Sequence, residues 1–255
     1  MSHERLQKFL PAIRTLDTDK PLTKHDLSAD SFLIKKDGGL GMYYAPHNEH
    51  INIGAKVVIA GITPGWHQMK TAYEQFIKSL AADKPLEACL KETKQAAGFA
   101  GSMRKNLINM LDKCGIPEVL DIPGSADLFG INRILLHTTS IIKYPVFIKG
   151  KNYTGHQPSI DRSPILQHYA YTEFPKELAE ITPPALVIPL GKTADRVMSR
   201  LAKEHKLPDH SYLTGFPHPS GANGHRVNQF RQQKVQLQAK VKTWGDGIPS
   251  SGISP

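Results

Sequence analysis

Cysteine is scarce in this sequence, which contains only Cys89 and Cys114. Two thiolates are too few for the four that a structural zinc site or an iron–sulfur cluster ordinarily uses. Close spacings of metal ligands such as His-Glu-x-x-His are also missing. The sequence therefore predicts free thiols in a reducing compartment, and a protein that needs no metal and no cofactor.

Long apolar runs are equally lacking. No segment approaches the ~20 apolar residues that span a bilayer, and the opening stretch MSHERLQKFLPAIRTL lacks the apolar core of a secretory signal. Hydrophobic residues make up 40% of the 255 positions, which is enough for a full core and argues against global disorder. We expect a soluble, cytoplasmic, monomeric protein that does not bind membranes.

Acidic residues are outnumbered, with 23 Asp and Glu against 32 Lys and Arg, for a net charge of +9. Basic proteins often bind polyanions, although many bind no nucleic acid. One segment, residues 225–242, has basic residues and no acid: Arg226, Arg231, Lys234, Lys240 and Lys242. Phosphate contacts of this kind give affinity without sequence selectivity. For any one of these residues, a solvated helix face is an equally good explanation.

Apolar runs of strand length alternate with helical patterns through most of the chain. The runs are KVVIAG from Lys56, RILLHTT from Arg133, ALVIPLG from Ala185 and YLTGFP from Tyr212. The helical patterns start near Ala72, Met103, Thr193 and His225. This alternation predicts an α/β fold, namely a three-layer α/β/α sandwich with a mostly parallel four-stranded central sheet.

The ends of the chain predict flanking segments around this domain. Glu4 to Leu16 has an amphipathic helical pattern, and residues 37–53 are typical of a loop or short strands. The Gly/Ser/Pro-rich end from Gly245 is typical of a flexible tail. We therefore expect an extension over residues 1–54, a main domain over 55–244 and a tail over 245–255.

Each predicted strand ends in chemically distinctive residues: GITPGWH, HTTS, LGKT and PHPSGANGHR. Ligands of open parallel sheets bind at the carboxyl ends of the strands, so these segments should line one crevice. LGKT lacks the earlier glycine of a phosphate loop, because Leu186 stands at that position, and Lys192 should instead begin a helix. Taken singly, GITPG is also an ordinary strand-to-helix turn, and His137 an ordinary core residue.

Together these motifs resemble those of the uracil-DNA glycosylase superfamily. GITPG after the first strand and HPSG from His218 after the last match its first and last motifs. GFAGSMRKNLINMLDKCGI from Gly98 is similar to the helix that follows the first motif in the iron–sulfur branch. HTTSIIKYP and PALVIPLGKTADRVM are similar to the ends of its second and third strands. The resemblance covers about residues 55–230 and implies a parallel sheet between helices.

The chain departs from this family in two ways. The cluster cysteines of the iron–sulfur branch are absent, so that cofactor is not carried over. The position that holds Asp or Asn in several branches is Thr63, and other branches have Ala there. The base-reading Asn of the second strand is not evident, and His137 or Ser140 stands in the matching region.

The resemblance implies excision of uracil or a related deaminated base from single- or double-stranded DNA, by hydrolysis of the N-glycosidic bond after base flipping. It implies His218 as the donor to the leaving base, and Thr63 as the residue that orients water, with Glu74 or Asp161 as possible replacements. Trp66 or Tyr144 would supply a flat wall, and Thr138 is a further candidate partner of the base. The expected substrate contacts are Gly61, Ile62, Pro64, Gly65, Trp66, His67, His137, Ser140 and Ser220. The expected DNA contacts are Gly221, Asn223, Arg226, Arg231 and Lys234.

Two other functions remain open at this point. One is a non-catalytic nucleic-acid-binding protein on the same fold, which would explain Thr63. The other is an α/β enzyme that acts on a small nucleoside or nucleotide.

Overall fold

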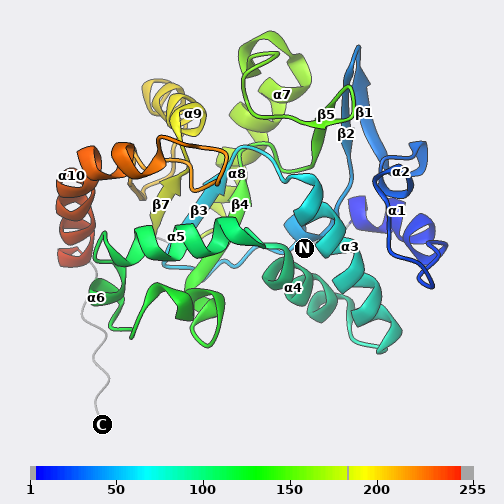
Figure 1. The fold of residues 1–255 in the computed structure, drawn as a ribbon, viewed down its shortest axis with the longest axis horizontal. Helices are drawn as coiled ribbons and strands as arrows, with labels where there is room; N and C mark the ends of the chain where they lie inside the picture. The colour runs from blue at the N-terminus through cyan, green and yellow to red at the C-terminus, as the bar shows by residue number, and fades with distance from the viewer. Residues whose placement is uncertain (1–3, 183, 248–255) are drawn as a thin grey trace. The chain divides into compact units, whose positions relative to one another are not determined.

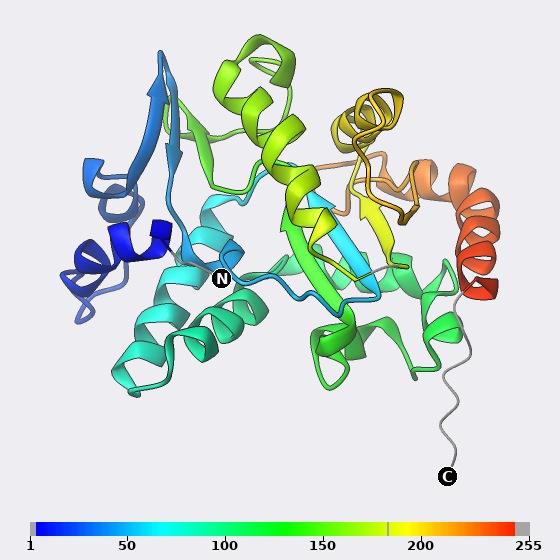
Figure 2. The same cartoon turned by 180° about the vertical axis from the view of Figure 1, so that it is seen from behind.

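The apolar runs of the sequence form a parallel sheet of four strands, in the order β4-β3-β7-β8. Figure 2 shows the first three side by side. All residues of β3, β4 and β7 are buried, as is typical of parallel sheets that are covered on both faces. The strands are β3 (Val57–Gly61), β4 (Leu136–Ser140), β7 (Leu186–Pro189) and β8 (Ser211–Tyr212). The mixed α/β class and the parallel four-stranded sheet are therefore confirmed.

Two of these strands are shorter than the sequence predicts. The run from Arg133 begins with a 3-10 turn, Arg133–Leu135, and the strand starts only at Leu136. The run from Tyr212 pairs over two residues. Gly215, with φ +90°, turns the chain away from the extended conformation, and Pro217 has no N–H for a sheet ladder.

A second sheet is antiparallel and has the order β1-β2-β5-β6. Its strands are β1 (Leu33–Asp37), β2 (Leu40–Tyr43), β5 (Val146–Ile148) and β6 (Lys151–Asn152). The sequence analysis allowed short strands in residues 37–53, where β2 lies, but predicted none of β1, β5 and β6. Strands of two or three residues are too short to show an alternating pattern.

Helices make up the rest of the regular structure (Figure 1). They are α1 (Glu4–Arg14), α2 (Lys24–Leu27), α3 (Trp66–Ala81), α4 (Leu86–Ala97), α5 (Ser102–Asp112), α6 (Ile116–Leu120), α7 (Pro164–His168), α8 (Phe174–Ala179), α9 (Lys192–Lys203) and α10 (Arg226–Asp246). A π-helical turn over residues 169–173 joins α7 to α8. The helix expected from Ala72 begins earlier, at Trp66, directly after Pro64 and Gly65. Lys192 begins α9, which confirms the helix start that the sequence predicts there.

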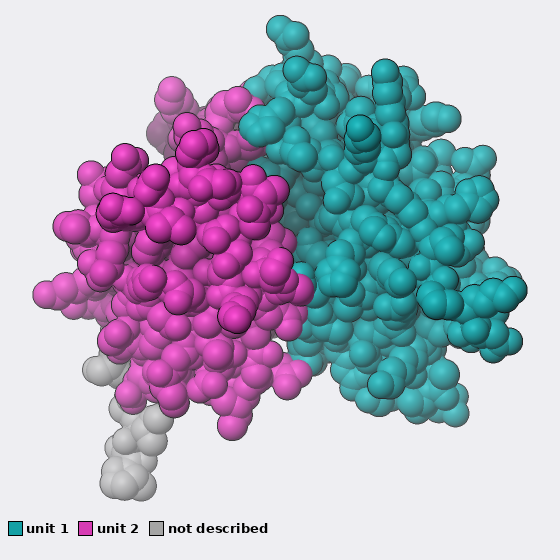
Figure 3. Space-filling view, in the orientation of Figure 1, with its two compact units in different colours: residues 1–51, 61–100, 138–180 teal, residues 52–60, 101–137, 181–255 magenta. Residues whose placement is uncertain are grey.

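The computed structural model describes residues 4–182 and 184–247, which fall into two compact units, coloured separately in Figure 3. Unit 1 comprises residues 1–51, 61–100 and 138–180, and unit 2 comprises 52–60, 101–137 and 181–255. Within the described ranges, no helix is both long and apolar enough to cross a membrane. Helix α10 includes Gly245 and Asp246, and residues 248–255 of the expected tail lie outside the described residues.

Replacing Ile59 with Ala should destabilise the protein strongly. Ile59 lies in the middle of β3 and is 0% exposed. Its truncation removes buried apolar surface and leaves a cavity, so the free energy of unfolding should fall by about 2–5 kcal/mol. Urea denaturation measures this loss. Val235→Ala on α10, where Val235 is 76% exposed, is the control and should change the value by less than about 0.5 kcal/mol.

Candidate functional site

His218 stands in unit 2, near the middle of the segment that leads from β8 to α10. The backbone N–H of Ser220 donates a hydrogen bond to its Nδ1, with an N–N distance of 3.2 Å. Burial lowers the pKa of His218 below its ordinary value of 6.5. A neutral imidazole carries one proton, and a ring that accepts at Nδ1 carries it on Nε2. His218 is therefore a neutral ring whose single donor is Nε2–H.

Three side chains hold the backbone of this loop. Each binds one of three consecutive carbonyl oxygens: Asn223 binds that of His218 at 3.2 Å, Asn106 that of Pro219 at 2.9 Å, and Arg226 that of Ser220 at 2.8 Å. The second amide proton of Asn223 goes to Gln229 Oε1, 3.0 Å away. Arg226 and Asn223, predicted as DNA contacts, thus also fix the loop that carries His218.

The glycine of the LGKT motif, Gly191, has a structural role next to His218. It has φ +84°, which is the left-handed region that glycine adopts at little cost. A Cβ at this position would lie 3.0 Å from Cβ of His218, and the Gly191 N–H donates to the carbonyl of Phe216 at 2.8 Å. The glycine before α9 therefore allows the close approach of the histidine.

The Gly61–Gly65 turn belongs to unit 1 and is held by the chain that follows β4. Backbone amides of residues 141 and 142 donate to the carbonyls of Gly61 and Ile62, at 2.9 and 2.8 Å. The Thr63 hydroxyl donates to the carbonyl of Tyr144 at 2.8 Å. Because this bond uses the hydroxyl proton, Thr63 Oγ1 can act toward a water molecule only as an acceptor.

The start of α3 is capped by two side chains. The N–H of Gly65 donates to Gln68 Oε1 at 3.3 Å, and the N–H of Trp66 donates to Asn152 Oδ1 at 3.0 Å. A Cβ on Gly65 would lie 3.3 Å from the amide nitrogen of Asn152, so a larger residue would push this cap away. The sequence analysis missed Asn152, because a two-residue strand gives no pattern that would single it out.

Phe99 is the second residue that the sequence analysis missed. Its side chain is 3% exposed, and its backbone has φ +50°, an unfavourable conformation for a bulky residue. A Cβ placed on Gly61 would lie 3.4 Å from the edge of this ring and 3.6 Å from Oγ of Ser140. A Cβ on Gly98 would lie 2.8 Å from Thr138 Oγ1. An aromatic ring and the hydroxyl of Ser140 therefore both face the first glycine of the turn.

Most of the other residues predicted to contact the base are buried in the protein interior. His137 is 1% exposed, and its Nδ1 accepts the N–H of Asn52 at 3.3 Å. Tyr144 is 2% exposed and donates its hydroxyl proton to Glu49 at 2.6 Å. Pro64 is also buried, whereas His67 is exposed in the first turn of α3.

The two carboxylates considered as bases are both engaged with neighbours. Glu74 is exposed on α3, with an oxygen 3.7 Å from Nζ of Lys70, one turn away. Asp161 accepts the hydroxyl proton of Tyr171 at 2.8 Å.

The predicted DNA contacts in unit 2 form an open surface. Gly221 and Gly224 are exposed, and a Cβ at either position would meet no atom within 4 Å. Arg231 is exposed on α10 and donates to Asn228 at 3.0 Å, while Lys234 is half-buried. This surface has room for a ligand backbone to approach closely.

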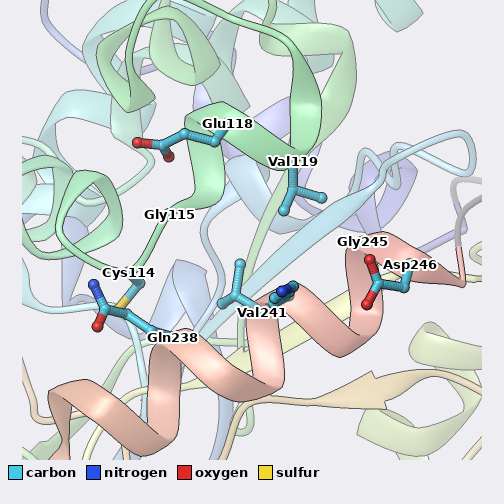
Figure 4. Close-up of a pocket in the computed structure, with 9 residues that line it drawn as sticks. Cys114, Gly115, Glu118, Val119, Gln238, Val241, Gly245 and Asp246 are labelled. Carbon is cyan, nitrogen blue, oxygen red and sulfur yellow. The ribbon is translucent and has the colours of Figure 1, made fainter.

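A cavity of about 370 Å³ lies elsewhere in unit 2, beside α6 and α10. Figure 4 shows Val119 and Val241 pointing toward each other, with Cys114 and Gln238 close together. Burial raises the pKa of the Cys114 thiol to about 12, so the thiol is inert at neutral pH. None of the expected substrate contacts lines this cavity, and of the basic residues in the segment 225–242 Lys242 does. In the described part of the chain, no group of three or more His, Cys, Asp or Glu side chains is arranged to hold a metal ion.

Sequence comparison links the chain to a bacterial protein. Over 239 residues it is 53% identical to YoxB of Bacillus subtilis (strain 168), described as uncharacterized, and the match covers 94% of this chain and 93% of that protein. The chain belongs to the YoxB family. No protein-family model matches the sequence.

The predicted site residues of this YoxB-family chain divide between the two units. The Gly61–Gly65 turn, Trp66, His67 and Ser140 belong to unit 1. His137, His218, Ser220 and the predicted DNA contacts belong to unit 2.

Replacing Gly191 with Ala should destabilise the protein and disturb His218. The added Cβ would meet His218 at 3.0 Å, and alanine at φ +84° is strained, so we expect a loss of about 1–2 kcal/mol from the backbone alone. Urea denaturation and the ring signals of His218 in NMR spectra measure the two effects. Gly54→Ala is the matched control, since a Cβ there meets nothing within 4 Å, and it should change neither.

NMR of ¹⁵N-labelled His218 should show a neutral ring protonated at Nε2 at pH 7.5. The N–H of Ser220 occupies Nδ1, and burial lowers the pKa. Because unfolded chains protonate histidine near pH 6.5 and folded His218 only at lower pH, its contribution to the free energy of unfolding should fall as the pH drops below 6.5. A proton on Nδ1, or an imidazolium ring at pH 7.5, would contradict this assignment.

Proposed function

We propose that this YoxB-family protein is a DNA glycosylase of the uracil-DNA glycosylase type, which excises uracil or a related deaminated base after flipping it from DNA. The observation that carries the proposal is the neutral His218 ring, with Nδ1 occupied by the Ser220 amide and its single proton on Nε2. The resemblance of GITPG and HPSG to the motifs of that superfamily points the same way.

A neutral histidine suits this chemistry. Cleavage of the N-glycosidic bond leaves negative charge on the departing base and positive character on the sugar. A preplaced N–H directed at a base oxygen stabilises the charge as it develops, more in the transition state than in the ground state. The carbonyl contacts of Asn223, Asn106 and Arg226 hold the loop in advance, so little reorganisation accompanies the reaction.

The Gly61 region supports a seat for a flat base. In this proposal Phe99 supplies the apolar wall and Ser140 a hydrogen-bond partner, because both face Gly61. Tyr144 is less suited to this role, because its ring already packs against Tyr44 and Tyr169 and its hydroxyl is bound to Glu49. Trp66, half-exposed at the start of α3, remains a candidate for the open side.

The attacking water requires orientation more than deprotonation. The resemblance implies a dissociative transition state, in which the sugar already carries positive character before water attacks. Thr63 Oγ1 donates to Tyr144 and keeps its acceptor capacity, so it can hold a water by one of that water's protons. A lone pair of the water then remains for the sugar carbon.

The proposal has further parts that follow from the same resemblance. The fold would be a three-layer α/β/α sandwich around the parallel sheet. The protein would act as a cytoplasmic monomer, with DNA as its partner. The exposed loop glycines and the basic residues of α10 support a backbone contact of this kind.

A second candidate is a non-catalytic nucleic-acid-binding protein. The observation that favours it is the use of the Thr63 hydroxyl proton in a bond to the backbone, together with the engagement of Glu74 and Asp161. Such a protein would bind DNA through the same basic residues and release no base.

A single-turnover assay distinguishes these candidates. Oligonucleotides carrying uracil paired with adenine, mismatched uracil, hypoxanthine or xanthine are incubated with excess protein, and abasic sites are detected by alkaline cleavage. We expect release of at least one of these bases. Binding of plain single-stranded DNA without release of any base would favour the second candidate, and neither binding nor release would contradict both.

Replacing His218 with Ala should lower the single-turnover rate by roughly 10²–10³-fold, the effect of losing one donor to a developing anion. DNA affinity should change little, because phosphate contacts dominate it. Thr63→Ala is the comparison and should cost much less, because its role is limited to accepting a bond from water. A His218→Ala protein that keeps its melting temperature and full activity would exclude the assigned site.

Replacing Arg231 and Lys234 together with Ala should weaken DNA binding in a salt-dependent way. If each contacts one phosphate, the slope of log affinity against log salt concentration should fall by roughly 2 units on duplex DNA. Fluorescence anisotropy at several salt concentrations measures the slope. An unchanged slope would mean that both side chains are merely solvated.

A further inference from the structure

The first turn of α9 contacts the segment that carries His218 at three points. Gly191 admits Cβ of His218, and its N–H binds the carbonyl of Phe216. Asp195 lies four residues after Gly191, in the first turn of α9, and its Oδ2 accepts the backbone N–H of Gly215 at 3.1 Å. All these residues lie in unit 2. Asp195 is therefore a side chain of α9 that binds the backbone of the β8–α10 segment three residues before His218.

The bond to Asp195 matters because its donor is a glycine, Gly215. Its φ of +90° lies in the left-handed region, where glycine is free to take up several other conformations. A glycine does not fix its own conformation, so an external contact has to select it. The bond to Asp195 does so three residues before His218.

The surroundings of Asp195 make its charge sensitive to pH. Burial raises the pKa of its carboxyl group to about 6, against the opposing effects of the Gly215 amide and of Lys240 on α10. Its second oxygen, Oδ1, is shielded from solvent and has no hydrogen-bond partner in the described residues. Nζ of Lys240 instead binds the neighbouring Thr214, at 2.9 Å from Oγ1 and 3.3 Å from the carbonyl oxygen.

We propose that Asp195 is a positioning residue for His218, whose ionised carboxylate holds Gly215 and whose protonation loosens the Gly215–His218 segment in mildly acidic solution. A carboxylate accepts an amide proton more strongly than a neutral carboxyl group does, so the loop is held best in the ionised state. The effect on activity rests on the proposed function, whereas the effect on the loop does not.

Stability and positioning should respond to pH in opposite directions. Because the pKa of folded Asp195 is about 6 and that of an unfolded aspartate is 3.8, the folded state binds the proton more tightly. The contribution of Asp195 to the free energy of unfolding is fully present below pH 3.8 and is lost as the pH rises through 6. If Asp195 had only a structural role, the acidic pH at which it adds most to the free energy of unfolding would not also loosen the loop.

Three variants test the inference by NMR between pH 5 and 8. In the native protein, the Gly215 amide shift should titrate with a midpoint near 6, whereas the His218 ring signals also follow the ring's own protonation. Asp195→Asn, which keeps the shape and an acceptor oxygen, should abolish this titration and unfold at a higher temperature than the native protein at pH 7.5. Asp195→Ala should raise the exchange rate of the Gly215 amide by about 10-fold, the effect of one lost hydrogen bond.

Asp112→Asn is the matched control. Asp112 Oδ1 accepts the backbone N–H of Ser125 at 2.7 Å, which is the same kind of bond elsewhere in unit 2. This variant should leave the Gly215 and His218 signals unchanged. Identical titrations of the Gly215 amide in the native protein and in Asp195→Asn would overturn the inference, even if the protein releases no base.

The pH dependence of the single-turnover excision rate provides a second, independent test. In the native protein the single-turnover rate should fall below pH 6, and in Asp195→Asn this fall should be displaced or absent. An active enzyme whose acid limb is the same with and without Asp195 would refute the positioning role and leave the proposed function intact. An inactive protein with the expected NMR titration would refute only the proposed function.

Discussion

The hydrogen bond from the Ser220 amide to Nδ1 of His218 determines what this ring can do. It places the proton on the outer nitrogen, and burial keeps the ring neutral. The bond in turn depends on the shape of a loop whose carbonyl oxygens are held from α5 and from the residues next to and within α10. One histidine therefore depends on elements more than a hundred residues apart in the chain.

The turn after β3 depends on a different constraint, which is the close packing of small residues against bulky ones. Gly61 faces the ring of Phe99, and Gly98 leaves room for Thr138. Phe99 holds an unfavourable backbone conformation between these contacts. Such strain persists only where the surrounding structure over-determines it, and it concentrates at binding and catalytic sites.

The sequence predicts the parallel sheet because its strands lie in continuous apolar runs. Helices α3, α5, α9 and α10 have clear patterns as well, whereas α4, α6, α7 and α8 were not predicted. The prediction failed where conformation depends on distant contacts. The two-residue β6, with the cap that Asn152 supplies, has no local signature. The strand predicted from Tyr212 ends early, before Gly215, which has a positive φ and donates its N–H to Asp195. Gly191 was noticed only as part of a failed phosphate motif, because its partner His218 lies 27 positions along the chain.

The division of the chain into alternating stretches affects how the protein is made. Each unit combines three separate stretches, the last of which are residues 138–180 in unit 1 and 181–255 in unit 2. During synthesis, neither unit has all its parts until most of the chain has left the ribosome, so long-range contacts must form late. Nascent chains would expose unpaired apolar strands such as β3 for most of that time. A single cut anywhere between residues 61 and 180 would therefore leave both fragments with incomplete units.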